Sequence, residues 1–476
     1  MYEFEDFLIA GQWTPPLRAR PFDVINPATE GVVGRISLGD AEDADRAVRA
    51  ARAAFPAYAA TTPAERILMM QRFIEIYRRR YEEMAQAITA EMGAPIGLAR
   101  GSQAILGMGH MQAAVQVIER FRFLEREGPN VISHEPIGVC AFITPWNWPV
   151  NQIACKVAPA LAAGCTVVLK PSEIAPLSGR LFAEFIDEAG FPPGVFNLVN
   201  GDGPGVGQAL ASHPEVDMVS FTGSTRGGIA VAKSAADTVK RVHQELGGKS
   251  PNIILDEDVL PEAMKTGVRD CFQNTGQSCN APTRLLVPRE MHARAIEYAR
   301  EAAALEIVGD PLDPATTMGP VVSQLQFDKI QAMIHVGIDE GASLIAGGPG
   351  RPRGLKRGYY VRPTIFADVD NRMRIAQEEI FGPVLAIIPY GGEAEAVRIA
   401  NDTPYGLAAY VQGSDDEAVR RVARRLRAGM VHCNGASMTL ASPFGGYKQS
   451  GNGREWGRFG FEEFLEIKVM LGVAAG

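Results

Sequence analysis

Short apolar runs, each bounded by Gly or Pro, mark the chain from residue 137 onward. Four of them predict buried parallel strands, at residues 138–143, 165–169, 195–199 and 218–221. Between these runs, amphipathic patterns predict helices over 152–163 and 178–189. The order strand, helix, strand, helix is typical of a doubly wound α/β sheet and favours a nucleotide-binding domain.

Two helices are predicted upstream of this region. Asp40, with Asp43 in the first turn, begins a helical pattern that runs to about Phe55, because both carboxylates can accept free backbone N–H groups. The Thr-Pro pair at 62–63 begins a second, longer helix that continues toward Glu91. Both are expected to cover an α/β domain.

The same alternation of strand-like and helix-like segments continues downstream, where a new domain is predicted to begin near Ser250. The stretch 462–471 alternates between apolar and polar residues like a β-strand, which suits pairing with another element or another subunit. Before it, the pattern predicts a strand over 284–287 and helices over 260–274, 291–304 and 323–340.

Composition and charge narrow the class of protein. A chain of 476 residues exceeds what one hydrophobic core organises, so two or more domains are expected. The hydrophobic fraction of 46% and the charged fraction of 21% exclude general disorder. A net charge of −8 argues against a nucleic-acid partner, which would need clustered Lys and Arg.

No targeting or metal-binding pattern stands out. The acidic start, residues 1–6, lacks the apolar core of a signal peptide, and the most apolar stretch, 157–169, is shorter than the ~20 residues of a membrane span. We therefore expect a cytoplasmic protein without a membrane partner. The six cysteines form no CxxC pair and have no histidine at ligand spacing, so reduced thiols and no catalytic metal are predicted.

Two segments combine a reactive side chain with a glycine turn. Cys279 follows a helical pattern and the turn at Gly276, and its neighbours are polar. Glu245 precedes a Gly-Gly turn at the predicted domain junction, where a carboxylate can act as a mobile base. Taken alone, a cysteine is more often a buried core residue and a glutamate more often a surface residue.

Three segments at the ends of predicted strands offer binding groups. The Asn147 amide can donate to a developing oxyanion, although an Asx-type turn explains it equally well. Lys170 and Glu173 can address ribose hydroxyls or a phosphate, but a helix capped by Ser172 also explains this segment. The glycine turn 221–228 favours a pyrophosphate, although it lacks the usual dinucleotide and P-loop spacings.

Two further segments, 378–383 and 442–451, are ordinary turns when taken alone. Together with the segments above, they make the chain resemble the aldehyde dehydrogenase superfamily over nearly its whole length and in the family's order. The resemblance implies an α/β fold with two doubly wound parallel-sheet domains and a small bridging oligomerisation element. It places a coenzyme-binding domain at 1–117 and 137–249, a catalytic domain at 250–447, and the bridging element at 118–136 and 448–476.

The resemblance also implies a reaction, the oxidation of an aldehyde to the carboxylic acid with hydride transfer to NAD(P)+. Cys279 is the implied nucleophile, which forms a thiohemiacetal and then a thioester, with Asn147 and the Cys279 N–H holding the oxyanion. Glu245 is the implied general base for hydrolysis, and Lys170 joins the catalytic set. No cationic neighbour in the sequence lowers the pKa of Cys279, so its activation is expected to come from the folded site.

Cofactor and substrate residues carry over from the same resemblance. A carboxylate at Glu173 repels a 2′-phosphate, which favours NAD, while Lys170 leaves NADP open. The implied cofactor-binding residues are Thr144, Trp146, Lys170, Glu173, Gly223, Ser224, Leu246, Glu379 and Phe381. The implied substrate funnel, lined by Trp148, Asn151, Gln152 and Cys155, suggests a polar or aromatic aldehyde.

Three questions stay open at this point. By analogy, the chain is expected to form a homodimer or homotetramer. One alternative reaction is that of a CoA-acylating semialdehyde dehydrogenase, against which the retained Glu245 argues. The other alternative is a structural or binding protein on the same scaffold, for which loss of the nucleophile or base would be the expected trace. Gln244 departs mildly from the family pattern, which has an aliphatic or small residue there.

Overall fold

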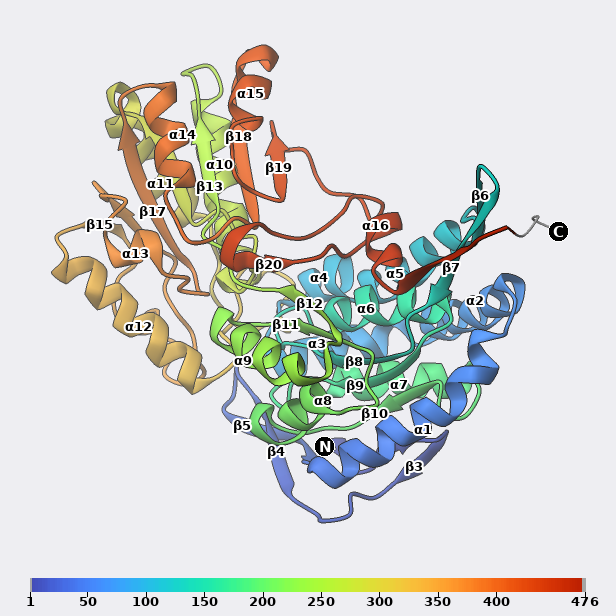
Figure 1. Cartoon of the computed structure of the whole chain (residues 1–476). Coiled ribbons are helices and arrows are strands. Elements are labelled where there is room, and N and C mark those ends of the chain that lie inside the picture. Colours follow the sequence, from blue (N-terminus) through green and yellow to red (C-terminus); the bar gives the residue numbers. More distant parts are fainter. Residues whose placement is uncertain (1, 473–476) are drawn as a thin grey trace.

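Two large β-sheets organise the chain, each flanked by helices (Figure 1). The computed structural model describes residues 2–472. The first sheet lies low in the view of Figure 1 and the second lies above it, at the upper left. Two smaller sheets of three strands each complete the fold.

The first sheet is parallel in its centre and antiparallel at its edges, in the order β20-β12-β11-β8-β9-β10-β2-β3. All four strands predicted between 138 and 222 are present, each within one residue of its expected bounds. The strands are β2 (Phe7–Ile9), β3 (Gln12–Thr14), β8 (Val139–Ile143), β9 (Thr166–Lys170), β10 (Phe196–Leu198), β11 (Met218–Thr222), β12 (Arg241–Glu245) and β20 (Gly451–Asn452).

The second sheet begins immediately after the predicted junction, and its order is β15-β16-β17-β14-β13-β18-β19. Every pairing is parallel except that of β15 with β16. The doubly wound α/β prediction is therefore confirmed for both sheets. The strands are β13 (Pro251–Ile254), β14 (Arg284–Pro288), β15 (Ser343–Ala346), β16 (Thr364–Ala367), β17 (Val384–Tyr390), β18 (Ala408–Gln412) and β19 (Met430–Cys433).

The helices begin where capping residues satisfy their first N–H groups. At α1, Asp40 accepts from Asp43 N and the Asp43 side chain accepts from Asp40 N, as the sequence predicts. The helices around the first sheet are α1 (Ala41–Ala59), α2 (Pro63–Arg79), α3 (Tyr81–Met92), α4 (Ile96–Leu98), α5 (Ala104–Ile118), α6 (Pro149–Ala163), α7 (Leu177–Glu188), α8 (Gln208–Ser212) and α9 (Thr225–Ala235). The later helices are α10 (Leu260–Phe272), α11 (His292–Ala304), α12 (Gln324–Asp339), α13 (Arg374–Gln377), α14 (Glu393–Asn401), α15 (Asp416–Ala423) and α16 (Gly457–Glu462).

The single long helix predicted from residue 62 toward Glu91 is two helices in the structure. Arg80 separates α2 from α3 with non-helical backbone angles, φ −104° and ψ 18°. Its guanidinium pairs with Glu83 and with Glu184 of α7, and it lies over the Phe185 ring. The break thus lets Arg80 bind α7, a contact that the local sequence pattern does not reveal.

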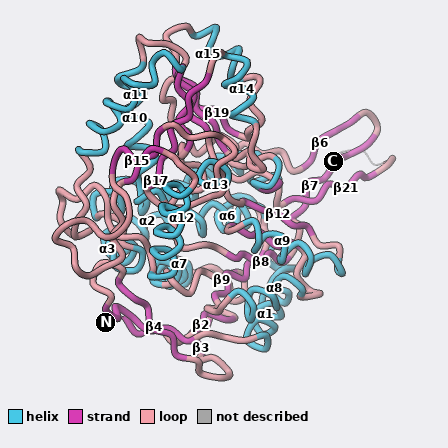
Figure 2. Tube along the Cα trace, turned by 90° about the vertical axis from the view of Figure 1, so that its left-hand side faces the viewer, coloured by secondary structure: helices cyan, strands magenta, loops and turns pink. Residues whose placement is uncertain are grey.

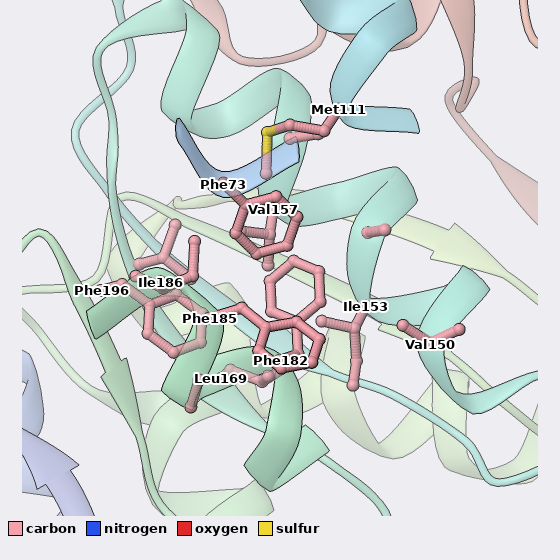
Figure 3. Packing of buried hydrophobic residues seen from close by; sticks show 14 of the residues in the cluster. Phe73, Met111, Val150, Ile153, Val157, Leu169, Phe182, Phe185, Ile186 and Phe196 are labelled. Atoms are coloured by element: carbon pink, nitrogen blue, oxygen red, sulfur yellow. The ribbon is translucent and has the colours of Figure 1, made fainter. Parts of the chain in front are cut away.

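The largest hydrophobic core packs α2, α5, α6 and α7 against the first sheet (Figure 3). Phe73 of α2 meets Phe182 of α7 with ring centroids 4.9 Å apart. Val157 of α6 and Leu169 of β9 are fully buried in the same cluster. Each such side chain contributes about 1.5–3 kcal/mol by burial, and together they fix α6 and the segment that precedes it.

Of the two small sheets, the sequence predicted a strand of one and gave no sign of the other. The N-terminal sheet, β1-β5-β4, was not expected, because only turn signals mark its region. The other sheet, β21-β7-β6, projects away from both large sheets in Figures 1 and 2 and includes the predicted C-terminal strand. Their strands are β1 (Tyr2–Phe4), β4 (Pro21–Asn26), β5 (Gly31–Ser37), β6 (Leu124–Glu127), β7 (Asn130–Pro136) and β21 (Leu465–Met470).

The predicted domain ranges map onto these sheets with one difference. The ranges 118–136 and 448–476 contain all three strands of the projecting sheet, but they also contain β20. Because β20 pairs with β12, this short segment extends the first sheet. The domain boundaries themselves stay a prediction, and the part of the range after residue 472 lies outside the described residues.

Candidate active site

Cys279 lies on an unusual loop that follows α10. Asn274, Thr275 and Gly276 have consecutive left-handed backbone angles, with φ of 54°, 58° and 70°. Non-glycine residues in this region cost of order 1–3 kcal/mol each. Gly276 is required sterically as well, since a Cβ there would come within 2.2 Å of the Gly382 carbonyl oxygen. The loop is therefore held by its contacts, and it leaves Cys279 partly exposed.

Cys279 lines two cavities at once, one of about 210 Å³ and one of about 480 Å³. We call them the small cavity and the funnel. Cys279 is half-buried, whereas Cys140, Cys155, Cys165 and Cys271 are buried. The core-thiol alternative thus describes those four cysteines and not Cys279.

Asn147 follows β8, at a strand end of the first sheet, and its side chain contacts the loop that carries Cys279. Its Nδ2 donates to the Gln277 carbonyl oxygen at 3.0 Å, and the neighbouring Trp148 donates through Nε1 to Ser278 Oγ at 2.8 Å. An amide nitrogen carries two hydrogens, so Nδ2 has a second N–H to donate, and Asn147 lines the small cavity that Cys279 also lines. This arrangement can hold an oxyanion beside the thiol.

Burial raises the pKa of the Cys279 thiol, and the carboxylates of Glu379 and Glu245 raise it further. Within residues 2–472, the charged groups that act most strongly on the thiol pKa are the carboxylates Glu379, Glu245 and Glu455, and no cation stands among them. The thiol is therefore neutral in this arrangement, unlike cysteine nucleophiles that a neighbouring cation activates.

Glu245 is the last residue of β12 and is buried, 1% exposed, beside the small cavity. Neither of its carboxylate oxygens has a hydrogen-bond partner. Burial raises its pKa well above the usual value, and the charge of Glu455 raises it further, while Lys156 opposes the shift. A carboxyl group in such a setting can serve as a general base near neutral pH.

A buried ion pair lies behind Glu245. Lys156 of α6 binds Glu455, and it also donates to Thr222 Oγ1 at 2.7 Å. Burial opposes the charge on both, but their mutual attraction lowers the pKa of Glu455 and raises that of Lys156. The thiol of Cys155 donates to the second oxygen of Glu455 at 3.3 Å.

The sequence-based placement of Cys155 in the funnel therefore needs correction. Its side chain is 2% exposed and lines neither cavity. The residues Asn151 and Gln152 do line the funnel, because they lie earlier on the same helix. The helical turn carries Cys155 round toward Glu455, away from the funnel.

Gly247 and Gly248 allow three functional segments to pack closely together. A Cβ on Gly247 would lie 2.5 Å from Glu379 Oε2, and one on Gly248 would lie 2.3 Å from the Cys279 carbonyl oxygen. The Gly248 N–H donates to Glu379 Oε1 at 3.0 Å. Only glycines allow the segment after Glu245 to contact both other segments this closely.

Most of the predicted cofactor residues line the small cavity. Trp146 and Phe381 meet edge to face there, with centroids 5.4 Å apart. Ser224 caps α9 by accepting from Gly227 N at 3.2 Å, so a helix N-terminus faces this region. The lining residues are Pro145, Trp146, Asn147, Thr222, Gly223, Ser224, Glu245, Leu246, Gly247, Cys279, Gln326, Lys329, Glu379 and Phe381.

Two residues of this cavity, Gln326 and Lys329, were missed by sequence reasoning. Both come from α12, where they look like ordinary polar positions of an amphipathic helix. Gln326 donates through Nε2 to the carbonyl oxygens of Ile380 and Phe381, at 3.1 and 2.7 Å. It therefore holds the loop that carries Glu379, a role that no local signal indicates.

Lys170 and Glu173 lie together but outside both cavities. Lys170 Nζ is 3.2 Å from Glu173 Oε2, and Thr144 N donates to the Lys170 carbonyl oxygen. Lys170 lines neither of the cavities that Cys279 lines, and its assignment to the catalytic set stays a prediction. Ser172 accepts from Ile174 N within a turn and caps no helix, since α7 begins at Leu177.

The funnel is lined largely by aromatic and uncharged side chains. Trp148 lies on its wall, and Phe444 and Trp456 stack at 5.0 Å. Tyr410, also on the wall, donates to the carbonyl oxygen of Asn280, the residue after the nucleophile. Sequence reasoning missed the contributions of Tyr410, Met438, Phe444 and Trp456, because they come from strands and loops far from α6.

Charged groups in the funnel lie on the C-terminal part of α10. Arg269 is 67% exposed, and it pairs with Asp270 at 3.3 Å. Burial raises the pKa of Asp270, and the charge of Arg269 opposes the shift. Arg269, the single Arg or Lys among the described residues of the funnel wall, is thus paired with a carboxylate.

Two features are absent from residues 2–472. No group of three or more His, Cys, Asp and Glu side chains is arranged to hold a metal ion. Within the same residues, no helix is long and apolar enough to cross a membrane.

Comparison with known proteins gives consistent matches. The family model described as "Aldehyde dehydrogenase family" matches residues 13–470. Among curated proteins, a 3-succinoylsemialdehyde-pyridine dehydrogenase from Pseudomonas sp. is 56% identical over 473 residues, 99% of each chain. A putative aldehyde dehydrogenase from Staphylococcus aureus is 47% identical over 472 residues, also 99% of each chain.

Two solved structures also match this chain over almost its whole length. A mutant of aldehyde dehydrogenase C from Pseudomonas syringae, complexed with NAD+ and octanal, is 54% identical with a TM-score of 0.98, covering 99% of this chain and 97% of that one. The NAD+ complex of a Mycobacterium tuberculosis aldehyde dehydrogenase is 40% identical with a TM-score of 0.96, covering 99% and 98%.

Proposed function

The chain belongs to the aldehyde dehydrogenase family, and on that premise we propose that it oxidises an aldehyde to the carboxylic acid with NAD+. The observation that carries the proposal is the position of Cys279 between the two cavities, with Asn147 and Glu245 lining the smaller one. A substrate entering through the funnel meets the thiol on one side, and a cofactor in the small cavity meets it on the other.

In the first step, the thiolate of Cys279 attacks the aldehyde carbon and the carbonyl oxygen takes the negative charge. The Asn147 amide and the backbone N–H of Cys279 donate to this oxyanion. Removing one such donor typically costs ~10²–10³ in rate. Because burial holds Cys279 neutral at rest, the thiol first loses its proton to solvent through the funnel, which Cys279 lines, and Glu245 stays free to act on water.

The residues of the small cavity fit a nicotinamide dinucleotide. Trp146 and Phe381 offer flat apolar surfaces, the α9 N-terminus suits a pyrophosphate, and Glu379 offers a carboxylate for ribose hydroxyls. When bound, the nicotinamide supplies an acceptor for the hydride lost from the substrate carbon, so that the adduct on Cys279 becomes a thioester.

Hydrolysis then releases the acid. Glu245 takes a proton from water while the water oxygen attacks the thioester carbon, and the Cys279 sulfur leaves. The raised pKa of Glu245 suits this step, since it makes the ionised carboxylate a stronger base toward water. CoA need not take part, because the base for water lies in the site.

NAD is proposed over NADP on electrostatic grounds. Glu173 lies within 3.2 Å of Lys170 Nζ, so the lysine charge is partly neutralised and a 2′-phosphate would meet a carboxylate. Lys170 still leaves a lower activity with NADP open. Two relatives have been solved with NAD+ bound, which supports use of NAD+.

We propose an uncharged aldehyde with an aromatic or medium-length aliphatic body as the substrate. The funnel presents Trp148, Tyr410 and Trp456, and its Arg269 is neutralised by Asp270. An acidic semialdehyde would find no unpaired Arg or Lys among the described residues of the funnel, since Lys329 lies in the small cavity instead. The octanal in the solved Pseudomonas syringae relative and the pyridine semialdehyde in the name of the curated relative suit such a funnel.

The chain is also proposed to assemble as a homodimer or homotetramer through the projecting sheet. On β21, Ile467 and Val469 are 70% and 52% exposed, and Leu124 of β6 is 60% exposed. Apolar side chains on a projecting strand are costly unless another surface covers them. The cytoplasmic location stays a prediction.

NADH formation from octanal, an aromatic aldehyde and succinic semialdehyde, each with and without CoA, tests the reaction. Acid is expected without CoA, and strict CoA dependence would overturn the hydrolytic assignment. Cys279→Ala is expected to lose more than ~10⁴-fold in kcat. Cys433→Ala, which removes the other half-exposed thiol, is the matched control and should retain activity. An active Cys279→Ala enzyme would refute the assigned nucleophile.

A further inference from the structure

Three buried polar atoms without hydrogen-bond partners lie together behind the active site. They are both carboxylate oxygens of Glu245 and Nε2 of His243. The two residues are two positions apart on β12, so their side chains leave the same face of the strand. His243 Nε2 lies 3.9 Å from Glu245 Oε1, and the side chains are 3% and 1% exposed. Unsatisfied buried groups of this kind are rare and call for an explanation.

The other end of the imidazole is already held. His243 Nδ1 lies 2.9 Å from Ser220 Oγ of the adjacent strand β11. Room for the ring comes from Gly453, where a Cβ would lie 2.0 Å from His243 Cδ2. Room for the carboxylate comes from Gly445, where a Cβ would lie 2.7 Å from Glu245 Oε1. Two glycines of the C-terminal region thus leave space for both side chains.

The other donors around Glu245 are committed elsewhere. Lys156 binds Glu455 and Thr222, and the Cys155 thiol donates to Glu455. Arg454 donates through Nη1 to the carbonyl oxygens of Gly446 and Gly453. Among the described residues, His243 Nε2 is the one Lys, Arg or His nitrogen within 4 Å of the carboxylate, and it has no hydrogen-bond partner.

We propose that His243 is the positioning residue of the general base, donating Nε2–H to the ionised Glu245 carboxylate while the Ser220 hydroxyl donates to Nδ1. The inference rests on the proposed function. Rotation of the Glu245 carboxyl closes the 3.9 Å gap by about 1 Å to hydrogen-bonding distance. The resulting Ser220–His243–Glu245 chain aims the carboxylate and favours its charged form, which is the form that removes a proton from water.

The charge state of the imidazole agrees with this role. Burial lowers the pKa of His243 to about 4, with the Glu455 carboxylate opposing the shift and Lys156 and Arg454 adding to it. The ring is therefore neutral at working pH and has one N–H to donate. The groups around Glu245 itself are Glu455 and Glu463, which disfavour its ionisation, and Lys156 and Arg454, which favour it.

The sign of the pH effect follows. A donor to the ionised carboxylate lowers the pKa of Glu245 relative to the same site without the donor. Removing His243 should raise that pKa, so the rising limb of the hydrolysis rate should move to higher pH. At pH values above both midpoints, the two enzymes should converge.

The test follows decay of the acyl group on Cys279 by mass spectrometry of samples quenched after mixing with NAD+ and octanal, across a range of pH. His243→Leu should shift the midpoint of the decay rate upward by about one unit, which is a ~10-fold loss below the midpoint. His243→Gln keeps an N–H donor and should restore most of the shift. Ser220→Ala, which leaves the ring unoriented, should give a smaller shift in the same direction.

Other outcomes overturn the inference. An unchanged midpoint in His243→Leu, or an equal loss at every pH, would show that His243 only supports the fold. If His243→Leu does not fold, the Gln and Ala variants decide, and an unshifted Ser220→Ala together with a shifted Gln variant refutes the donor role. A wild-type enzyme that never carries an acyl group on Cys279 refutes the proposed function instead.

Discussion

The two cavities that meet at Cys279 are built in different ways. The small cavity is shaped by strand ends and by glycines such as Gly247, where a Cβ would collide with Glu379. The funnel is shaped by side chains from α6, α10, β18 and the segment 435–456, including Trp148 and Phe444. The path of the backbone therefore sets much of the shape of the small cavity, whereas side chains set the shape of the funnel.

The difference has a consequence for substitutions. A substitution that displaces the backbone around the small cavity should disturb the cofactor site and the Cys279 loop together, because these two segments contact each other directly. A changed side chain in the funnel should alter substrate preference and leave cofactor binding intact. Four substitutions test this contrast, in order of expected size.

The largest effect is expected in the small cavity, at Glu245. Glu245→Gln removes the base and keeps the shape, so acid formation should fall ~10³-fold while acylation of Cys279 persists. Acyl-enzyme should accumulate in quenched samples analysed by mass spectrometry. Turnover at the wild-type rate would show that another group activates the water.

Gly248→Ala should cost about 10²-fold in kcat/KM, since small displacements of a catalytic group have effects of this size. The added Cβ would lie 2.3 Å from the Cys279 carbonyl oxygen, which is backbone and cannot rotate aside. Steady-state kinetics and Tm measure the change. Gly97→Ala, which meets nothing within 4 Å, is the control, and equal effects in both variants would contradict the steric argument.

A substitution near the predicted adenosine site should change the cofactor preference. Glu173→Gln removes the charge that would repel a 2′-phosphate, so the ratio of kcat/KM for NADP to that for NAD should rise about 5- to 10-fold. Activity with NAD at saturation should change little, because Glu173 lies outside both cavities. A ratio that stays constant would remove Glu173 from the cofactor site.

The smallest effect is expected at the funnel mouth. Asp270→Asn leaves the Arg269 charge without its partner, so kcat/KM for succinic semialdehyde relative to octanal should rise about 3-fold, in keeping with a largely exposed pair. The Kd for NAD+ should stay the same. Asp258→Asn, another surface carboxylate, serves as control. A fall in the ratio would contradict the substrate class proposed here.

Local sequence was sufficient for much of this architecture. The strands from β8 to β11 lie within one residue of their predicted bounds, and the glycine turns around Gly223 and Gly247 lie where binding was expected. Buried parallel strands and glycine turns are restricted by sterics within a few residues, so their pattern is readable directly. The family order of the segments then linked Cys279, Glu245 and Asn147, which the cavities bring together.

Other features depend on contacts between residues far apart in the chain. Lys156 and Glu455, separated by 299 positions, pair only because α6 and the C-terminal segment meet behind β12. The same packing buries Cys155. A separate contact, between α12 and the segment after α13, brings Gln326 onto the Glu379 loop. The sequence by itself determined the elements and the reactive side chains, through short-range sterics and apolar periodicity. Only the tertiary structure decided the electrostatics of Cys279 and Glu245, because burial and the surrounding charges shift a pKa, and both arise from the whole fold.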